Sequence, residues 1–200
     1  EVEIELALQR HSTSKIQSLD DLFNIQTLGF RGEALPSIAS ISNLKITPNP
    51  AGAGLTVEVK NLFHNTPVRK KFLKADTTEI RQCVDIISKY LMVSPQVSFK
   101  FISDGKTLLF SPGNGKALDA IAAALGTELS KDLVQIQFDQ KPVKVSGYIS
   151  RPTTSRLDKN HETFFVTQRF VRHFLLNRAL EEAYRTLIPG NRYPVGGVQL

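Results

Sequence analysis

Two glycines followed by an apolar helical pattern constrain this 200-residue chain more than any other feature. Gly29 and Gly32 flank a short segment that includes Arg31, and apolar residues with helical spacing begin at Leu35. Glycine adopts backbone angles that other residues resist, and Pro36 is tolerated in a first helical turn because its missing N–H costs little there. We therefore predict a glycine loop that opens into a helix. The unpaired N–H groups at such a helix start suit an anion, above all a phosphate.

This signal is weak by itself, because two glycines before a helix are more often a tight turn. The flanking sequence makes it more specific. RHSTSKI occupies residues 10–16, GFRGEAL residues 29–35 and NLFHNTPVRKKFL residues 61–73. In this order the three motifs resemble the MutL-type DNA mismatch-repair proteins, which carry an ATPase domain of GHKL type. The resemblance extends from about residue 5 to about residue 195.

The resemblance implies that residues 11–28 are the ATP lid, a mobile loop that closes over the nucleotide, and that backbone N–H groups of residues 29–35 face the phosphates. The family enters one strand near the adenine pocket through Gly-Thr; here Gly54-Leu55 takes that place, so only Thr56 carries over. The implied ATP-binding residues are Thr13, Ser14, Lys15, Gly29, Phe30, Arg31, Gly32, Glu33, Ala34, Leu35 and Thr56. An ordinary solvated loop with a lysine is the alternative interpretation.

Composition sets broader limits. The net charge is +6 and the pI is near 9.5. This positive charge is compatible with binding an anionic polymer, and it is equally explained by solubility alone. The single cysteine, Cys83, excludes an internal disulfide and a cysteine-cluster metal site, and we expect it to be a buried small apolar residue. No apolar run has membrane-spanning length, and we expect no secretory signal or membrane partner. The resemblance implies a cytoplasmic or nucleoid location in a bacterium and a nuclear one in a eukaryote.

Patterns in the first half predict short elements. We expect helices at residues 4–9 and 18–23, a strand at 44–47 and a half-buried strand at 55–60. A helix should start at Pro67 with Thr66 as N-cap, and another should run from a capping box at 76–79 to just before Pro95. Asp104-Gly105 predicts a hairpin between strands at 97–102 and 107–110. Residues 60–74 hold five basic side chains and no acidic one. A solvated helix face explains them better than a nucleic-acid patch, because no aromatic ladder accompanies them.

Turn-forming residues 111–115 form the best linker. Beyond it we predict a helix at 117–125 that ends at Gly126, strands at 133–138, 143–149 and 163–166, and a helix at 171–187. This order matches the small ribosomal-S5-like unit of MutL-type proteins. The family has FVNGR where residues 165–169 read FVTQR, so we expect that connection to differ. The resemblance attributes DNA contact to the last helix, here through Arg178 and Arg185, although Glu181 and Glu182 weaken that case.

The predicted fold class is therefore α/β (α+β), with a GHKL-type ATPase sandwich fragment at residues 1–110 and a ribosomal-S5-like α/β domain at 116–200. The family takes its general base and Mg²⁺ ligand from a Glu-x-x-x-Asn helix and its adenine contact from Asp-Asn-Gly-x-Gly. Neither motif stands in this sequence, and the family's γ-phosphate lysine would follow Leu200. We expect a segment of a slow ATPase that uses ATP and Mg²⁺, with no catalytic residue of its own and no hydrolysis by the segment alone.

The function implied by the resemblance is that of an ATP-dependent dimerising clamp. It would link mismatch recognition to downstream repair factors. The implied partners are DNA, a MutS-type mismatch-recognition protein, a downstream endonuclease or helicase, and a second copy or a paralogue. Two alternatives remain open: another GHKL ATPase, such as a type II topoisomerase subunit, and a non-enzymatic basic DNA-binding module.

Overall fold

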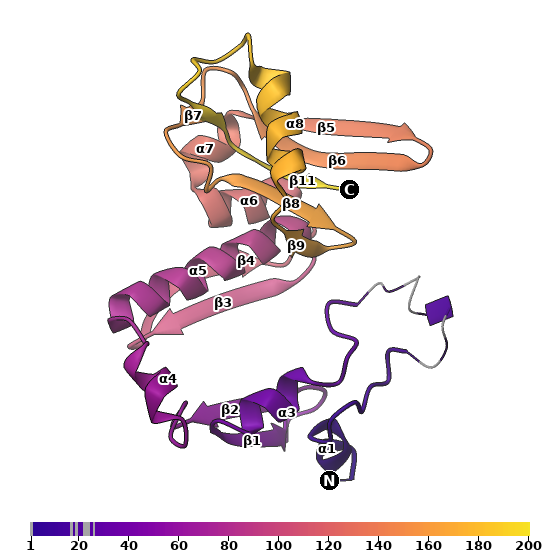
Figure 1. The fold of residues 1–200 in the computed structure, drawn as a ribbon, viewed down its shortest axis with the longest axis vertical. Coiled ribbons are helices and arrows are strands. Elements are labelled where there is room, and N and C mark those ends of the chain that lie inside the picture. The colour runs from indigo at the N-terminus through magenta and orange to yellow at the C-terminus, as the bar shows by residue number, and fades with distance from the viewer. Residues whose placement is uncertain (1, 17, 19, 22–24, 26) are drawn as a thin grey trace. The chain divides into compact units, whose positions relative to one another are not determined.

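The computed structural model describes residues 2–16, 18, 20–21, 25 and 27–200. The chain divides into two compact units, Glu1–Ala75 and Asp76–Leu200 (Figure 1). This division falls before the linker at residues 111–115, because the helix and hairpin that precede the linker contact the elements that follow it. The assignment of residues 1–110 to an ATPase domain and 116–200 to an S5-like domain stays a prediction.

The first unit contains short elements joined by long connections. They are α1 (Val2–Ala7), α3 (Ala34–Ala39), β1 (Asn43–Pro48), β2 (Leu55–Lys60) and α4 (Pro67–Lys71). The helix predicted at 4–9 thus lies two residues earlier. In the segment predicted as a capped helix, the N–H groups of Ser18 and Asp21 each donate to the other residue's side chain, at 2.9 and 3.3 Å. Leu19, Leu22 and Phe23 of that prediction lie outside the described residues.

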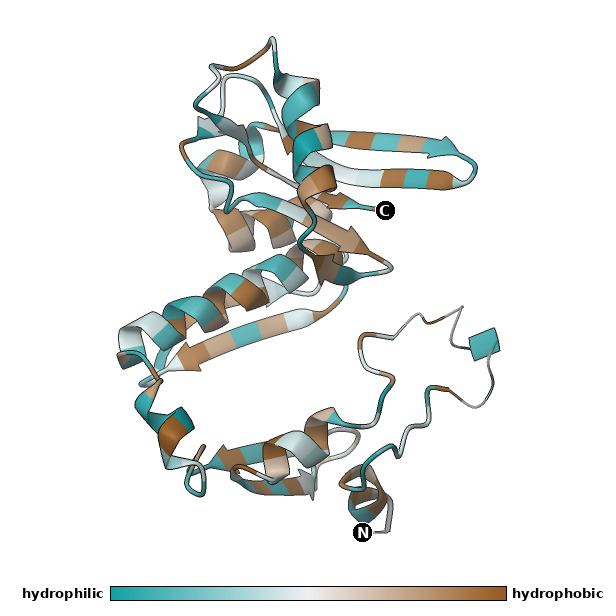
Figure 2. Cartoon of the chain, viewed as in Figure 1, coloured by the Kyte–Doolittle hydropathy of each residue, from teal (hydrophilic) through white to brown (hydrophobic). Residues whose placement is uncertain are grey.

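β1 and β2 form an antiparallel hairpin in which Thr47 pairs with Thr56. The alternation of apolar and polar residues along β2 is as predicted (Figure 2). The predicted half-burial is wrong: Leu55, Val57 and Val59 are 65%, 50% and 44% exposed. The reason is that α3 packs on β1, while the described residues place no further layer over β2.

Pro67 occupies the first turn of α4, as predicted. The predicted N-cap is wrong in its chemistry. Thr66 holds the N-cap position, but its side chain makes no capping hydrogen bond, and its Oγ1 is buried without a partner within the described structure. A hydroxyl that caps a helix must reach the second or third N–H, which usually goes with extended backbone angles at the N-cap, whereas Thr66 has a φ of −130° and a ψ of 70°.

The second unit contains a longer helix and more extensive pairing. Its helices are α5 (Asp76–Val93), α6 (Ala117–Leu125), α7 (Thr127–Lys131) and α8 (Phe174–Tyr184). Its strands are β3 (Ser98–Ser103), β4 (Lys106–Pro112), β5 (Leu133–Gln140), β6 (Val143–Ser150), β7 (Ser155–Arg156), β8 (Glu162–Val166), β9 (Arg169–Val171), β10 (Tyr193–Pro194) and β11 (Gly196–Gln199).

Five of these strands form one sheet in the order β5-β6-β11-β8-β9 (Figure 1). β11 runs parallel to β8, and the other pairs are antiparallel. β3 and β4 form a separate hairpin whose turn residues Asp104 and Gly105 have φ angles of 48° and 73°. Two consecutive positive φ angles are what a two-residue hairpin turn requires, so the hairpin prediction is confirmed.

The buried hydrophobic core of the described chain belongs to the second unit. Its members are Leu91, Leu109, Ala120, Ile121, Leu133, Phe164, Phe165, Tyr184, Val195 and Val198. Leu91 of α5 is fully buried, which agrees with the predicted apolar stripe of that helix. The expectation that Cys83 is buried is wrong: it lies on the exposed side of α5, one position away from the stripe. Among the described helices, none is both long and apolar enough to cross a membrane.

The sequence analysis did not predict strand β9 or the tight turn that joins it to β8. The helix expected from Val171 begins at Phe174, where the Nδ1 of His173 accepts a hydrogen bond from the N–H of Leu175 at 3.3 Å. Upstream, Thr167 and Gln168 form the two-residue turn with φ angles of 47° and 64°. The expectation that this connection differs from the glycine-containing one of the family stays a prediction. The chain makes a left-handed turn with two side chains that disfavour it.

Replacing Gln168 with glycine should therefore stabilise the second unit. The left-handed conformation costs a non-glycine residue about 1–2 kcal/mol, so we expect Gln168→Gly to raise the free energy of unfolding by about 1 kcal/mol. Denaturant unfolding measures this change. Gln137→Gly in β5 is the matched control and should lower stability, because glycine weakens a strand at ordinary angles. Equal losses in both variants would contradict strain at the turn.

Candidate functional site

A pocket of about 460 Å³ in the first unit collects the predicted phosphate loop and the segment upstream of it. Every predicted ATP-binding residue except Thr56 lines this pocket, namely Thr13, Ser14, Lys15, Gly29, Phe30, Arg31, Gly32, Glu33, Ala34 and Leu35. Ala7, Ser12, Leu28 and Pro36 complete the lining. Two motifs separated by a lid-like spacer in sequence thus face one cavity.

Gly32 holds the two motifs together through their backbones. Its φ is +62°, an angle that glycine adopts without a steric penalty. A Cβ at this position would lie 2.7 Å from the carbonyl carbon of Ser12 and 2.8 Å from its nitrogen, and still closer to its oxygen. Real Cβ atoms do not approach backbone atoms so closely, so only glycine fits between the loop and Ser12.

Polar contacts order both segments further. The Nδ1 of His11 lies 3.6 Å from the Oε1 of Glu33, which joins the first motif to the start of α3. The Oγ1 of Thr13 accepts a hydrogen bond from the N–H of Lys15 at 3.1 Å. The Oγ1 of Thr27 donates to the carbonyl of Gly29 at 3.0 Å. The His11–Glu33 pair is exposed, so it adds little stability.

The loop presents backbone donors that bind no acceptor in the described part of the chain. Within the described residues, no backbone or side-chain acceptor is bound by the N–H groups of residues 31–35. Lys15 and Arg31 are exposed cations on the same lining, and the Cζ of Arg31 lies 5.4 Å from the centre of the Phe30 ring. Free amides beside two cations have the chemistry that suits phosphate oxygens.

The pocket lining therefore suits the phosphates of a nucleotide. The described part of the chain shows no set of side chains that suits a metal ion. No group of three or more His, Cys, Asp or Glu side chains there is arranged to hold a metal ion. Glu33 is the one carboxylate on the pocket lining, and it faces His11.

The remaining predicted site residues lie elsewhere. Thr56 is exposed on β2 and does not line the pocket, so its adenine contact stays a prediction. Arg178 lies within α8, and Arg185 is the C-cap of that helix; both line a cavity of about 310 Å³ in the second unit. Arg192 also lines it, and sequence reasoning missed this residue because it follows the helix after a Pro-Gly turn.

The two carboxylates that weakened the DNA case each have a cationic partner. The Oε1 of Glu181 lies 2.5 Å from the Nζ of Lys159, and the Oε1 of Glu182 lies 3.0 Å from the Nη1 of Arg185. Partial neutralisation of Glu181 by a lysine from another segment could not be read from the helix sequence. Arg178 has no ion-pair partner among the described residues.

Comparison with known proteins identifies the chain. A family model described as DNA mismatch repair protein, C-terminal domain, matches residues 121–200. The DNA mismatch repair protein MutL of Halothermothrix orenii is 42% identical over 216 residues, which cover 96% of this chain and 34% of that protein. The chain belongs to the MutL family. The MutL of Symbiobacterium thermophilum is 41% identical, and the match covers 95% of this chain and 34% of that protein.

The MutL-family chain spans about a third of the length of these relatives. Solved structures agree on its fold. The crystal structure of the N-terminal domain of a DNA repair protein has a TM-score of 0.72 at 23% identity, covering all of this chain and 70% of the other. The MutL ATPase domain of Aquifex aeolicus complexed with ADP has a TM-score of 0.60 at 21% identity, with 100% and 88% covered. The predicted α/β (α+β) fold class is confirmed, and the MutL ATPase neighbour agrees with a GHKL-type fragment. The S5-like assignment of residues 116–200 stays a prediction.

Proposed function

We propose that the pocket lined by residues 12–15 and 28–36 binds the phosphates of ATP. The observation that supports this most is that residues 31–35, whose N–H groups bind no acceptor among the described residues, line the same cavity as Lys15. Each amide can donate to a phosphate oxygen, and Lys15 adds a charged donor at the rim. A related MutL ATPase domain has been solved with ADP, which agrees with a nucleotide as the ligand.

The protein that contains this segment is, in this proposal, a slow ATPase. Hydrolysis requires a general base to activate water and Mg²⁺ to offset phosphate charge. The described pocket lining carries one carboxylate, Glu33, and the family resemblance gives this residue no role as a base or metal ligand. These residues therefore bind and orient the phosphate groups, and both the base and the metal ligand come from other parts of the protein.

ATP binding then orders the lid at residues 11–28 and allows two copies, or a copy and a paralogue, to pair as a clamp. A loop with few apolar anchors orders at low cost when a ligand supplies new contacts. The clamp would relay mismatch recognition by a MutS-type protein to a downstream endonuclease or helicase. This relay rests on membership of the MutL family.

Limited proteolysis tests the nucleotide part of the proposal. In the protein that contains this chain, a non-hydrolysable ATP analogue should slow cleavage between Arg10 and Gly32. Inorganic sulfate at the same ionic strength is the control. It should protect this segment little from cleavage, because it cannot bridge the lid and the loop. Unchanged cleavage with the analogue, together with tight and salt-sensitive DNA binding, would favour a DNA-binding module without ATP.

DNA contact through α8 gives a second prediction. We expect Arg178→Gln/Arg185→Gln to weaken binding of a short duplex about tenfold and to reduce the slope of log K against log salt by about 2, one for each lost phosphate contact. Lys100→Gln/Lys106→Gln removes the same charge from exposed positions on the β3–β4 hairpin and should leave the slope nearly unchanged. Fluorescence anisotropy over a salt series measures both. Equal slopes for the two double variants would contradict a specific role of α8.

A further inference from the structure

A second pocket, of about 580 Å³, lies within the second unit and has no part in the site described above. It is bounded by one face of α5, the segment 159–161 together with the first residue of β8, strand β9 with the residue after it, and α8. Its lining consists of Arg81, Gln82, Asp85, Lys89, Lys159, Asn160, His161, Glu162, Phe170, Val171, Arg172 and Asn177. None of the residues predicted to bind ATP or DNA is among them.

The pocket has more positive charge than its own carboxylates balance. Four cationic side chains line it, and they face Asp85 and Glu162. Asp85 pairs with Lys89 at 2.5 Å, whereas Lys159 pairs with a glutamate outside the lining. Arg81 and Arg172, both exposed, have no carboxylate partner among the residues that the structure describes.

One aromatic ring gathers two of these cations. The Nζ of Lys89 lies 4.7 Å and the Cζ of Arg172 5.6 Å from the centre of the Phe170 ring. Cation–π attraction holds each cation near the ring, but the two charges repel one another. Lys89 is only 7% exposed, so water screens that repulsion weakly. An anion beside Phe170 relieves it.

The second carboxylate opposes this charge weakly. Glu162 is 6% exposed, and its Oε2 accepts a hydrogen bond from the Nδ2 of Asn177 at 2.5 Å. Its Oε1 is buried without a partner within the described structure. Burial raises the pKa of Glu162 above its ordinary value, against the smaller lowering effect of Asn177. The neutral form of a carboxyl group is favoured by such surroundings.

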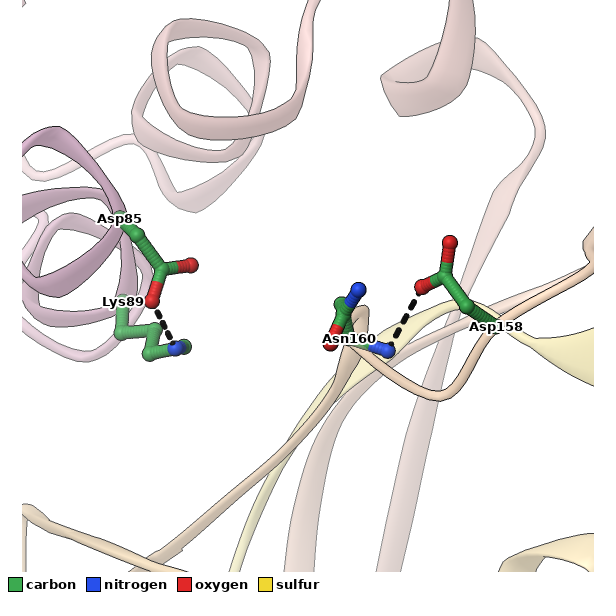
Figure 3. A network of polar contacts seen from close by, with 4 residues as sticks. All are labelled: Asp85, Lys89, Asp158 and Asn160. Atoms are coloured by element: carbon green, nitrogen blue, oxygen red, sulfur yellow. Dashed lines mark hydrogen bonds and ion pairs between the residues drawn. The ribbon is translucent and has the colours of Figure 1, made fainter. Parts of the chain in front are cut away.

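Amide donors complete the lining. The side chain of Lys89 extends toward Asn160, whose backbone N–H donates to the Oδ1 of Asp158 at 2.9 Å (Figure 3). The side-chain amide groups of Asn160 and Gln82 make no hydrogen bond within the described residues. Phe170 is already engaged by Lys89, Arg172 and Phe165, so it offers little ring surface for a base to stack on.

We propose that this pocket is a phosphate-binding site in which Arg81, Lys89 and Arg172 bind the phosphate oxygens. Two guanidinium forks and an ammonium match the geometry and charge of a phosphate group. The phosphate has two possible sources, a nucleic-acid backbone or a free phosphate compound. The proposal is independent of ATP binding in the first unit, because the two pockets share no residue.

Hydrogen exchange in the protein that contains this chain tests the site, with inorganic phosphate as the probe. Phosphate should slow exchange in peptides covering residues 78–90 and 168–173. Arg81→Gln/Arg172→Gln should raise the phosphate concentration that gives half-maximal protection at least about tenfold. Both arginines are exposed, so the variant should keep the wild-type Tm. Lys100→Gln/Lys106→Gln carries the same charge change and should respond like the wild type. Equal phosphate responses in wild type and the arginine variant would overturn the proposal.

A second measurement distinguishes the sources. If the natural ligand is a nucleic-acid backbone, Arg81→Gln/Arg172→Gln also reduces the salt slope for binding a 20-nucleotide DNA strand by about 1 to 2. If it is a free phosphate compound, protection by inorganic phosphate is lost while the DNA slope matches that of the control variant. Failure of the ATP proposal would appear separately, as unchanged exchange at residues 29–35 with an ATP analogue.

Discussion

Gly32→Ala should abolish ATP-analogue binding at concentrations that saturate the wild type. The new Cβ must occupy space held by the backbone of Ser12, at a φ of +62°. The left-handed angle costs about 1–2 kcal/mol and the overlap about 1–3 kcal/mol more, so we expect affinity to fall at least about 30-fold. Isothermal titration of the purified protein with the analogue measures the change.

Gly29→Ala is the matched control, because it adds the same methyl group three residues earlier in the same loop. A Cβ at Gly29 meets no atom within 4 Å, and its φ is not in the left-handed region. We expect affinity within about threefold of the wild type, since no new contact or strain arises. Normal binding by Gly32→Ala, or an equal loss in both variants, would contradict the backbone contact between the two motifs.

Lys15→Ala should weaken ATP-analogue binding about 10- to 100-fold, because a hydrogen bond to a charged group contributes about 1.5–3 kcal/mol. Lys15 is exposed and has no ion-pair partner in the described chain, so its loss should leave Tm unchanged. The same titration measures the affinity, and differential scanning fluorimetry measures Tm.

Lys45→Ala controls for the loss of one positive charge from the same unit. Lys45 is exposed on β1 and does not line the pocket. Replacing Lys45 should change the affinity for the analogue only slightly. At about 0.1 M salt, exposed charges more than about 10 Å apart are largely screened from one another. Similar losses for Lys15→Ala and Lys45→Ala would assign the effect to net charge instead of a contact with phosphate.

Local turn chemistry made much of the fold predictable. Asp104-Gly105 predicted the β3–β4 hairpin, and Gly126 the end of α6, because few residues other than glycine tolerate the angles found there. The same reasoning missed β9. Thr167 and Gln168 adopt left-handed angles without glycine, and only pairing with β8 reveals the turn.

Burial was less predictable, since it depends on what packs over an element. The apolar residues of β2 alternate as in a half-buried strand but are exposed. Cys83 has an apolar neighbour at Val84, yet one step along a helix rotates a side chain by about 100°, which places Cys83 on the outer face. Periodicity gives the side of an element, and tertiary contacts decide whether that side is covered.

For the candidate site, linear motifs were sufficient where the pocket is built from two continuous segments. RHSTSKI and GFRGEAL supplied the lining at residues 13–15 and 29–35. The contact of Gly32 with Ser12 could not be foreseen, because the sequence does not say which backbone approaches a glycine. The pocket of the second unit that we propose to bind phosphate was missed for a related reason: its arginines, Arg81 and Arg172, are about 90 residues apart in sequence.

Hydrogen exchange at residues 29–35 tests the central claim most directly. It would be measured by mass spectrometry on the protein that contains this chain, with and without a non-hydrolysable ATP analogue. If these amides bind phosphate oxygens, the analogue should slow their exchange at least about tenfold, as new hydrogen bonds to charged acceptors require. Saturating analogue that leaves exchange at residues 29–35 unchanged would contradict the assignment of this loop as the phosphate site.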